Sequence, residues 1–160
     1  MSYQDFTDDI SSTKNTNKLT LINTHTMSAE EISPYWNDIV SCIAKYCDKF
    51  PDDETIENVI GQCARGERQL WLIIDELDNV VLTPITEIIT LASNGKKILM
   101  YAQAGGSRIE DALPLMSEIE EWAKKEHGVT QAHWWGRKGY RKLLGDYGFS
   151  ESIVIFKKDI

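Results

Sequence analysis

The stretch ILMYAQAGGSRIEDALPLMSEIEEWAKKEHG (98–128) decides the fold, because it joins an apolar strand to a long helix through two glycines. Gly105 and Gly106 allow a tight turn after the strand. Ser107 and Glu110 have the spacing of a capping box, which predicts that the helix begins there. The apolar residues that follow recur at helical spacing: Ile109, Leu113, Met116, Ile119 and Ala123, with Gly128 as the predicted C-cap.

Upstream, the pattern predicts one strand, two helices and two further strands. The first strand is KLTLINT (18–24), and Ser28 with Glu31 opens a helix that runs to Cys47. Asp52 or Asp53 caps a second helix, with its apolar stripe over 56–63. The two strands are 68–76 and 80–93, the latter bent by Pro84 or placed at an edge, and NGKK (94–97) predicts a hairpin.

Downstream, VTQAHWW (129–135) predicts a strand, 136–149 a short helix and turn, and SESIVIFKKDI (150–160) the final strand. The element order is therefore β-α-α-β-β-β-α-β-α-β, a mixed α/β (α+β) domain over residues 18–160. Residues 1–17 are polar and predict a flexible tail ahead of that domain.

The composition limits the function classes. A net charge of −8 over 160 residues repels nucleic acid and anionic membranes. No apolar run reaches membrane-spanning length, and the first residues do not resemble a signal peptide, so we expect a cytoplasmic protein or one built into a particle there. The three cysteines and three histidines lack ligand spacing, which predicts no metal site and a reducing compartment.

This order resembles the Gcn5-related N-acetyltransferase (GNAT) superfamily over about residues 18–158. The resemblance implies a central, mostly antiparallel sheet with splayed fourth and fifth strands and helices on both faces. The stretches AGGSRIEDALPLMSEIEEWAKKEHG (104–128) and WWGRKGYRKLLGDYGFSESIVIFKKDI (134–160) more narrowly resemble small GNAT-like proteins of tailed bacteriophages. That likeness implies a location in the host cytoplasm, with incorporation into a virion as a further expectation.

The resemblance implies acetyl-CoA as cofactor, held by backbone N–H groups after the fourth strand. Here the matching residues are Gln103, Gly105, Gly106, Ser107 and Arg108, with spacing that departs from the superfamily pattern. The alternative is a helix start that Ser107 and Glu110 cap themselves, with Glu110 and Asp111 repelling a pyrophosphate.

The resemblance also implies a tyrosine acid four residues before the glycine of Gly148–Phe149, where this chain has Leu144. Tyr140 lies nearby but out of register. Glu87, between apolar residues of a strand, is a candidate general base, or a strand glutamate that faces solvent.

The stretch HWWGRKGYRKLLGDYGF (133–149) gathers aromatic and basic residues. By strand alternation at most one of Trp134 and Trp135 is buried. Together with Arg137 and Lys138, the exposed tryptophan predicts a protein interface, while a contact to the CoA 3′-phosphate is the alternative and nucleic acid is disfavoured by the net charge.

The self-capped helix, the leucine at the acid position and the polar tail favour a non-catalytic binding or structural role. Such a protein would be a virion part or would bind a host protein, and its partner would be another protein or a second copy of itself. The alternative is an acetyl-CoA-dependent N-acetyltransferase.

Overall fold

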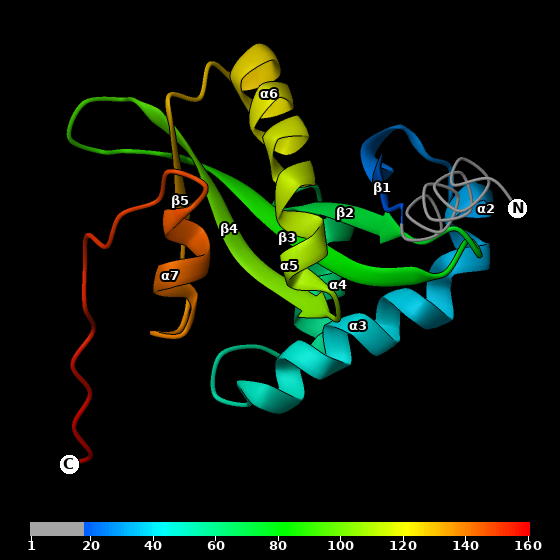
Figure 1. Ribbon diagram of the computed structural model, residues 1–160, viewed down its shortest axis with the longest axis horizontal. Coiled ribbons are helices and arrows are strands. Elements are labelled where there is room, and N and C mark those ends of the chain that lie inside the picture. The colour runs from blue at the N-terminus through cyan, green and yellow to red at the C-terminus, as the bar shows by residue number, and fades with distance from the viewer. Residues whose placement is uncertain (1–17) are drawn as a thin grey trace, which may run out of the picture.

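A five-stranded sheet in the order β1-β2-β3-β4-β5 runs through the computed structural model, which describes residues 18–160 (Figure 1). β4 and β5 are parallel, and every other neighbouring pair is antiparallel. The strands are β1 Thr20–Asn23, β2 Gln69–Ile74, β3 Val80–Thr90, β4 Lys97–Gly106 and β5 Gln131–Trp134. The predicted mixed α/β architecture is confirmed, and the predicted tail, 1–17, lies outside the described residues.

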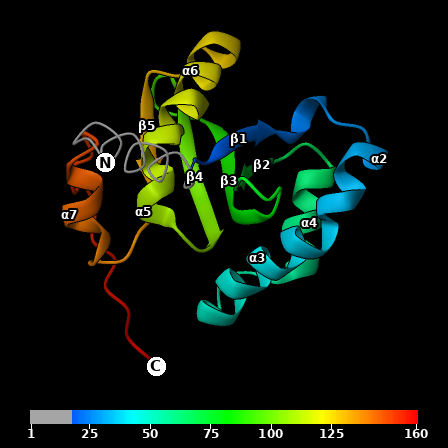
Figure 2. The ribbon, with the colours of Figure 1, turned by 45° about the vertical axis from the view of Figure 1, so that its right-hand side comes forward.

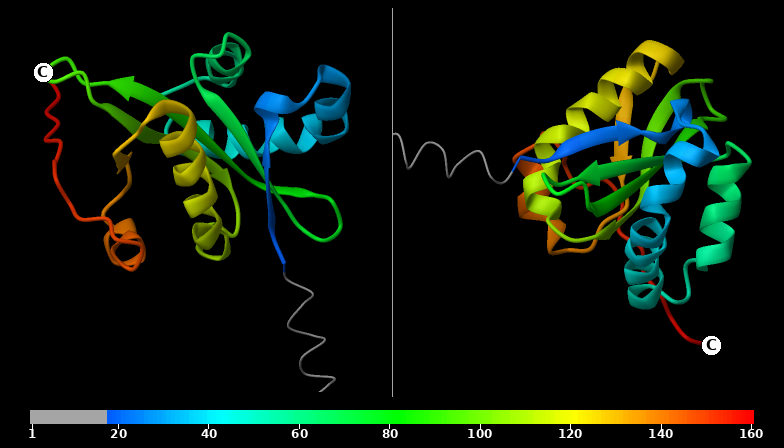
Figure 3. Two further views of the ribbon diagram at one scale, coloured as in Figure 1. Left: turned by 90° about the horizontal axis from the view of Figure 1, so that it is seen from above. Right: turned by 90° about the vertical axis from the view of Figure 1, so that its right-hand side faces the viewer.

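Helices cover both faces of the sheet (Figure 3). One face carries α3 (Trp36–Lys49) and α4 (Ile56–Ala64), and the other carries the helical run of α5 (Ile109–Ala112), η4 (Leu113–Leu115) and α6 (Met116–His127). The remaining short elements are η2 (Thr24–Thr26), α2 (Ala29–Ile32), η3 (Ser33–Tyr35) and α7 (Tyr140–Gly145).

The two faces bury separate apolar clusters. On the α6 face the cluster includes Leu99, Leu113 and Ile119, and on the α3 face it includes Ile39, Leu72 and Ile85. These residues alternate along the strands and recur every three or four positions along the helices, so the sequence pattern and the burial agree. Burial of these two clusters is what holds both helical layers on the sheet.

Ahead of β2, the helix boundaries differ in two places from the sequence prediction, and after β4 the predicted single helix is divided by η4 into α5 and α6. Ser28 and Glu31 do form the predicted capping box, but the 3₁₀ turn η3, which begins at Ser33 and contains Pro34, divides the predicted helix into α2 and α3. The cap of α4 is Thr55, whose side chain accepts a hydrogen bond from the Asn58 N–H, and is neither Asp52 nor Asp53.

The predicted final strand, 150–160, is wrong for this structure, because the segment makes no strand pairing. Figures 1 and 2 show that it leaves the body beside α7, away from the sheet. Its apolar side chains are exposed, with 83% of Ile153 and 92% of Phe156 open to solvent. The pattern is that of a strand, but a strand needs a partner edge, and this segment has none within the described chain.

No helix in the described part of the chain is both long and apolar enough to span a bilayer.

Candidate functional site at the divergence of β4 and β5

β4 and β5 pair only over a short stretch, Ile98–Tyr101 with Gln131–Trp134. Beyond it β4 continues to Gly106 with β3 on one side, and within residues 18–160 no strand pairs with its other side. The register against β3 shifts at this point: Thr86 is opposite Tyr101 and Ile85 is opposite Gln103, so Ala102 is an extra residue in β4. Such a bulge bends the strand, which is how β4 diverges from β5.

The bulge also changes which side chains of β4 face each helical layer. Tyr101 belongs to the cluster under α6, whereas Gly105 faces α3, where an added Cβ would meet the Cys42 carbonyl. Gln103 shares the α3 side with Gly105 by alternation. It is only 5% exposed, and neither its Oε1 nor its Nε2 has a hydrogen-bond partner among the described residues. A buried amide without partners is costly, and this one lies where the strands separate.

An aromatic cluster lies at the last paired position of β4 and β5, where the two strands separate. The rings of Tyr101 and Trp134 stack with centroids 4.7 Å apart, and Phe149 and Tyr140 lie 6.3 Å and 6.4 Å from Trp134. The Tyr101 hydroxyl lies 3.2 Å from both the Met116 carbonyl and the Glu120 carboxylate, to which it donates. Burial, followed by the nearby Glu120 charge, raises the pKa of Tyr101, so this phenol stays protonated.

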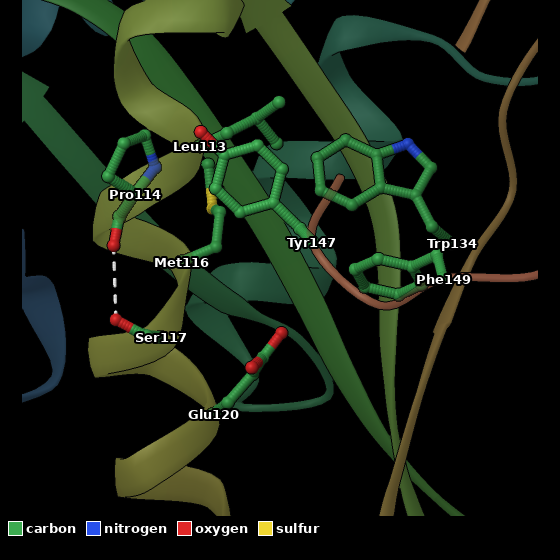
Figure 4. A pocket seen from close by; sticks show the side chains of 8 residues that line it. All are labelled: Leu113, Pro114, Met116, Ser117, Glu120, Trp134, Tyr147 and Phe149. Atoms are coloured by element: carbon green, nitrogen blue, oxygen red, sulfur yellow. Dashed lines mark hydrogen bonds between the residues drawn. The ribbon is translucent and has the colours of Figure 1, made fainter. Parts of the chain in front are cut away.

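A pocket of about 130 Å³ opens beside this cluster (Figure 4). The helical wall carries Glu120, and Trp134 and Phe149 form the opposite wall. The residues that line it are Leu113, Pro114, Met116, Ser117, Glu120, Trp134, Tyr147 and Phe149. A volume near 150 Å³ holds a benzene-sized group, so this pocket takes one ring or a narrow chain.

Glu120 is the one acidic side chain that lines the pocket. Burial raises the pKa of its carboxyl, and the hydrogen bond from Tyr101 opposes that rise. A carboxylate with a raised pKa holds a proton more strongly than an ordinary glutamate, which suits proton transfer. Glu120 was not among the residues predicted from the sequence, although it lies four residues after Met116 on the apolar face of the helix.

The helix start after β4 is not self-capped, so the predicted capping box at Ser107 and Glu110 is wrong. The backbone N–H and the hydroxyl of Ser107 both donate to the Val81 carbonyl, at 2.8 Å and 3.3 Å. The N-cap is Arg108, in the left-handed conformation (φ 59°, ψ 34°), and no side chain caps the helix. The first-turn N–H groups therefore have no intrahelical partner and no side-chain partner at the cap.

The charges at this helix start have both signs. Glu110 and Asp111 lie in the first turn, where carboxylates interact favourably with the helix dipole. The Arg108 guanidinium lies 3.0 Å from the Asp111 carboxylate and offsets part of that negative charge. The helix start can therefore receive an anion, although the exposed carboxylate of Glu110 would repel it.

The two glycines are required by packing. A Cβ on Gly105 would lie 2.2 Å from the Cys42 carbonyl oxygen, and one on Gly106 would lie 2.3 Å from that of Val81. Gly106 also has a φ of 129°, which side chains rarely adopt. Both positions let β4 approach α3 and β3 closely, and a ligand role for them remains a prediction.

The candidate catalytic residues are placed apart from the pocket or beside it. Glu87 forms an ion pair with Arg68, which also bonds Glu54, at 3.2 Å and 3.3 Å. Tyr140 packs its ring on Trp134 at the start of α7. Leu144, at the position where the superfamily has its acid, is buried in the α6-side cluster and offers no proton.

Trp134 and Trp135 differ in exposure, as strand alternation predicts. Trp134 packs against the core, while Trp135 is 72% exposed. The Arg137 guanidinium lies 5.6 Å and 5.7 Å from the ring centroids of Phe50 and Tyr140, and Lys138 is exposed beside it. Arg137 thus connects the end of α3 to α7 across the open side of β4. An interface at these residues stays a prediction.

Among the described residues, no group of three or more His, Cys, Asp or Glu side chains is placed to hold a metal ion.

The chain has the fold of the GNAT acetyltransferases, as comparison with solved structures shows. A glucosamine-6-phosphate N-acetyltransferase from Arabidopsis thaliana matches with a TM-score of 0.63 and 11% identity, over 89% of this chain and 98% of that one. A putative acetyl transferase from Pyrococcus furiosus matches with a TM-score of 0.60 and 16% identity, over 89% and 100%.

The aminoglycoside 6′-N-acetyltransferase AAC(6′)-Ih from Acinetobacter baumannii gives a TM-score of 0.60 at 16% identity, over 89% of this chain and 99% of that one. No family model matches the sequence, and no curated protein matches it. The likeness at these identities establishes the fold. The narrower resemblance to phage proteins gains no support from these comparisons and stays a prediction.

Proposed function

We propose that the protein is an acetyl-CoA-dependent N-acetyltransferase that binds its cofactor along the diverging part of β4. The observation that supports this most is the uncapped helix start at Arg108, which removes the main physical objection raised by the sequence. The fold is shared with acetyltransferases of several kinds, which favours this reading over the non-catalytic one.

The residues at the helix start fit an anionic cofactor. The N–H groups of Ile109 and Glu110 would receive the pyrophosphate together with the Arg108 side chain, because a helix N-terminus favours anions. The carboxylates of Glu110 and Asp111 weaken this site without closing it. Bound acetyl-CoA would supply an acetyl group activated as a thioester.

The chain's own residues would then orient the reactants and exclude water. The stacked rings of Tyr101 and Trp134 close the point where β4 and β5 separate. Gln103, whose buried amide has no hydrogen-bond partner among the described residues, is a candidate to bond a polar group of the cofactor. Glu120, with its raised pKa, is the pocket residue suited to accept a proton from an acceptor amine.

Binding of acetyl-CoA, measured by calorimetry, tests the proposal. We expect Arg108→Gly to weaken binding about tenfold, because it removes the guanidinium and keeps the left-handed backbone. Asp111→Asn should strengthen binding about threefold, since it removes a repelling charge. The matched control is Asp78→Gly, at the other non-glycine residue with positive φ (63°), on the turn between β2 and β3.

Absence of binding in the wild type and in Asp111→Asn would refute the proposal. Equal binding by wild type and Arg108→Gly would place the cofactor elsewhere. The substitution Gly106→Glu is unsuited to this test, because the Cβ clash with Val81 would disturb folding as well as binding.

A second candidate function is binding without chemistry. The burial of Leu144 at the acid position supports it, because the site then lacks the superfamily's proton donor for the leaving thiolate. Binding of acetyl-CoA alone does not separate the two, so an activity assay with acetyl-CoA and small primary amines decides whether bound cofactor is used.

A further inference from the structure

The segment 150–160 exposes four consecutive apolar side chains to solvent. Ile153, Val154, Ile155 and Phe156 are 83%, 52%, 71% and 92% exposed. A run of this length on a soluble protein indicates a surface that is covered in the working state.

The composition of this run is that of a strand covered on both faces. Ile153 and Ile155 point to one side of an extended chain, and Val154 and Phe156 to the other. β-branched and aromatic residues favour strands, and apolar residues on both faces are typical of strands that are buried on both sides.

An open strand edge is present in the same molecule. β5 pairs with β4 on one side, and among the described residues no strand lies along its other edge. Such an edge presents unpaired N–H and carbonyl groups to any extended chain of suitable length. Trp135, at the end of β5, is itself 72% exposed, so an apolar surface continues from that edge.

We propose that the segment of one copy pairs with the β5 edge of a second copy, in a twofold dimer that exchanges the two segments. The structure favours a second copy over the chain's own edge, because the segment leaves α7, where Glu151 pairs with Arg141, and extends away from the sheet (Figures 1 and 2).

Each chain carries an unpaired strand-like segment and, along β5, an open edge, so a twofold pair satisfies both. The net charge of −8 on each copy opposes association. Salt should therefore strengthen the dimer by screening that repulsion. The proposed dimer does not depend on acetyl-CoA binding.

Sedimentation velocity of the full chain tests the proposal. The wild type should sediment as a species of twice the 18.2 kDa chain mass, and the dimeric fraction should increase at higher salt. The double variant I153K/I155K should raise the dimer dissociation constant at least about a hundredfold. Leu77→Lys is the matched control, since Leu77 is 82% exposed on the turn between β2 and β3 and lies outside the proposed interface.

Hydrogen exchange identifies the paired strands. We expect slow exchange at 152–156 and at 131–134 in the wild type, and fast exchange at both in the double variant. A monomeric wild type would overturn the proposal, whether its segment is protected by its own β5 or left unprotected. A dimer that persists in I153K/I155K would also overturn it, because another surface would then hold the copies together.

Discussion

Gly105→Ala tests the direct contact between β4 and α3 that positions the site. Gly105 is buried on β4, and an ideal Cβ there would lie 2.2 Å from the Cys42 carbonyl oxygen and 3.3 Å from the Tyr46 Cβ. A carbon and a carbonyl oxygen seldom approach closer than about 3.3 Å. The added methyl group therefore requires α3 to move by about 1 Å from the sheet.

The cost follows from what must move. Overpacking a core costs about 1–3 kcal/mol, and we expect the upper end because the obstacle is helix backbone, which cannot rotate away. A loss of about 3 kcal/mol, with a urea dependence of about 2 kcal/mol per molar, lowers the unfolding midpoint by about 1.5 M.

Urea unfolding followed by tryptophan fluorescence measures the effect. Gly145→Ala is the matched control, because nothing lies within 4 Å of its added Cβ and the residue ends α7. It should leave stability unchanged or raise it by up to about 1 kcal/mol. A Gly105→Ala protein within about 0.5 kcal/mol of the wild type would refute the close packing of α3 on β4.

Three further predictions concern the pocket and the thiols. Burial raises the pKa of the Glu120 carboxyl, so the folded state binds its proton more tightly than the unfolded state does. The wild type should therefore lose stability relative to Glu120→Gln as the pH rises above about 4.5, which urea unfolding at several pH values measures. A stability difference between the two proteins that does not change with pH would contradict this. Tyr101→Phe should cost about 1 kcal/mol in urea unfolding and raise the pKa of Glu120 further, because the hydrogen bond that lowers it is lost; a carboxyl titration by NMR that does not move would count against that contact. Burial raises the pKa of Cys63 to about 11, so iodoacetamide at neutral pH should label this thiol slowly in the native protein and fully in urea; rapid native labelling would contradict its burial.

Much of the fold was predictable from periodicity. The continuous apolar run at the start of β4 and the three-and-four spacing of Met116, Ile119 and Ala123 identify a strand and a helix whose burial the structure confirms. The prediction for 150–160 was wrong because a run of β-branched and aromatic residues reports that a segment suits a sheet, and not whether an edge is within its reach.

The site was predictable only in part. The order of elements predicted a candidate cofactor loop directly after β4. The N-cap at Arg108 depends on a left-handed backbone conformation, which the spacing of residues does not encode. The Ser107 hydroxyl bonds Val81, a residue 26 positions away, so a local motif could not reveal that competition. The pocket residue Glu120 was missed for the same reason, because its neighbours Tyr101 and Trp134 come from strands far along the chain.

The most direct test of the cofactor site is a titration of coenzyme A into the isotope-labelled protein, followed through backbone amide resonances. If the uncapped helix start receives the pyrophosphate, the amides of Ile109, Glu110 and Asp111 shift first, and those of α4 stay in place. Saturating coenzyme A that leaves these three amides unmoved would contradict the proposed site.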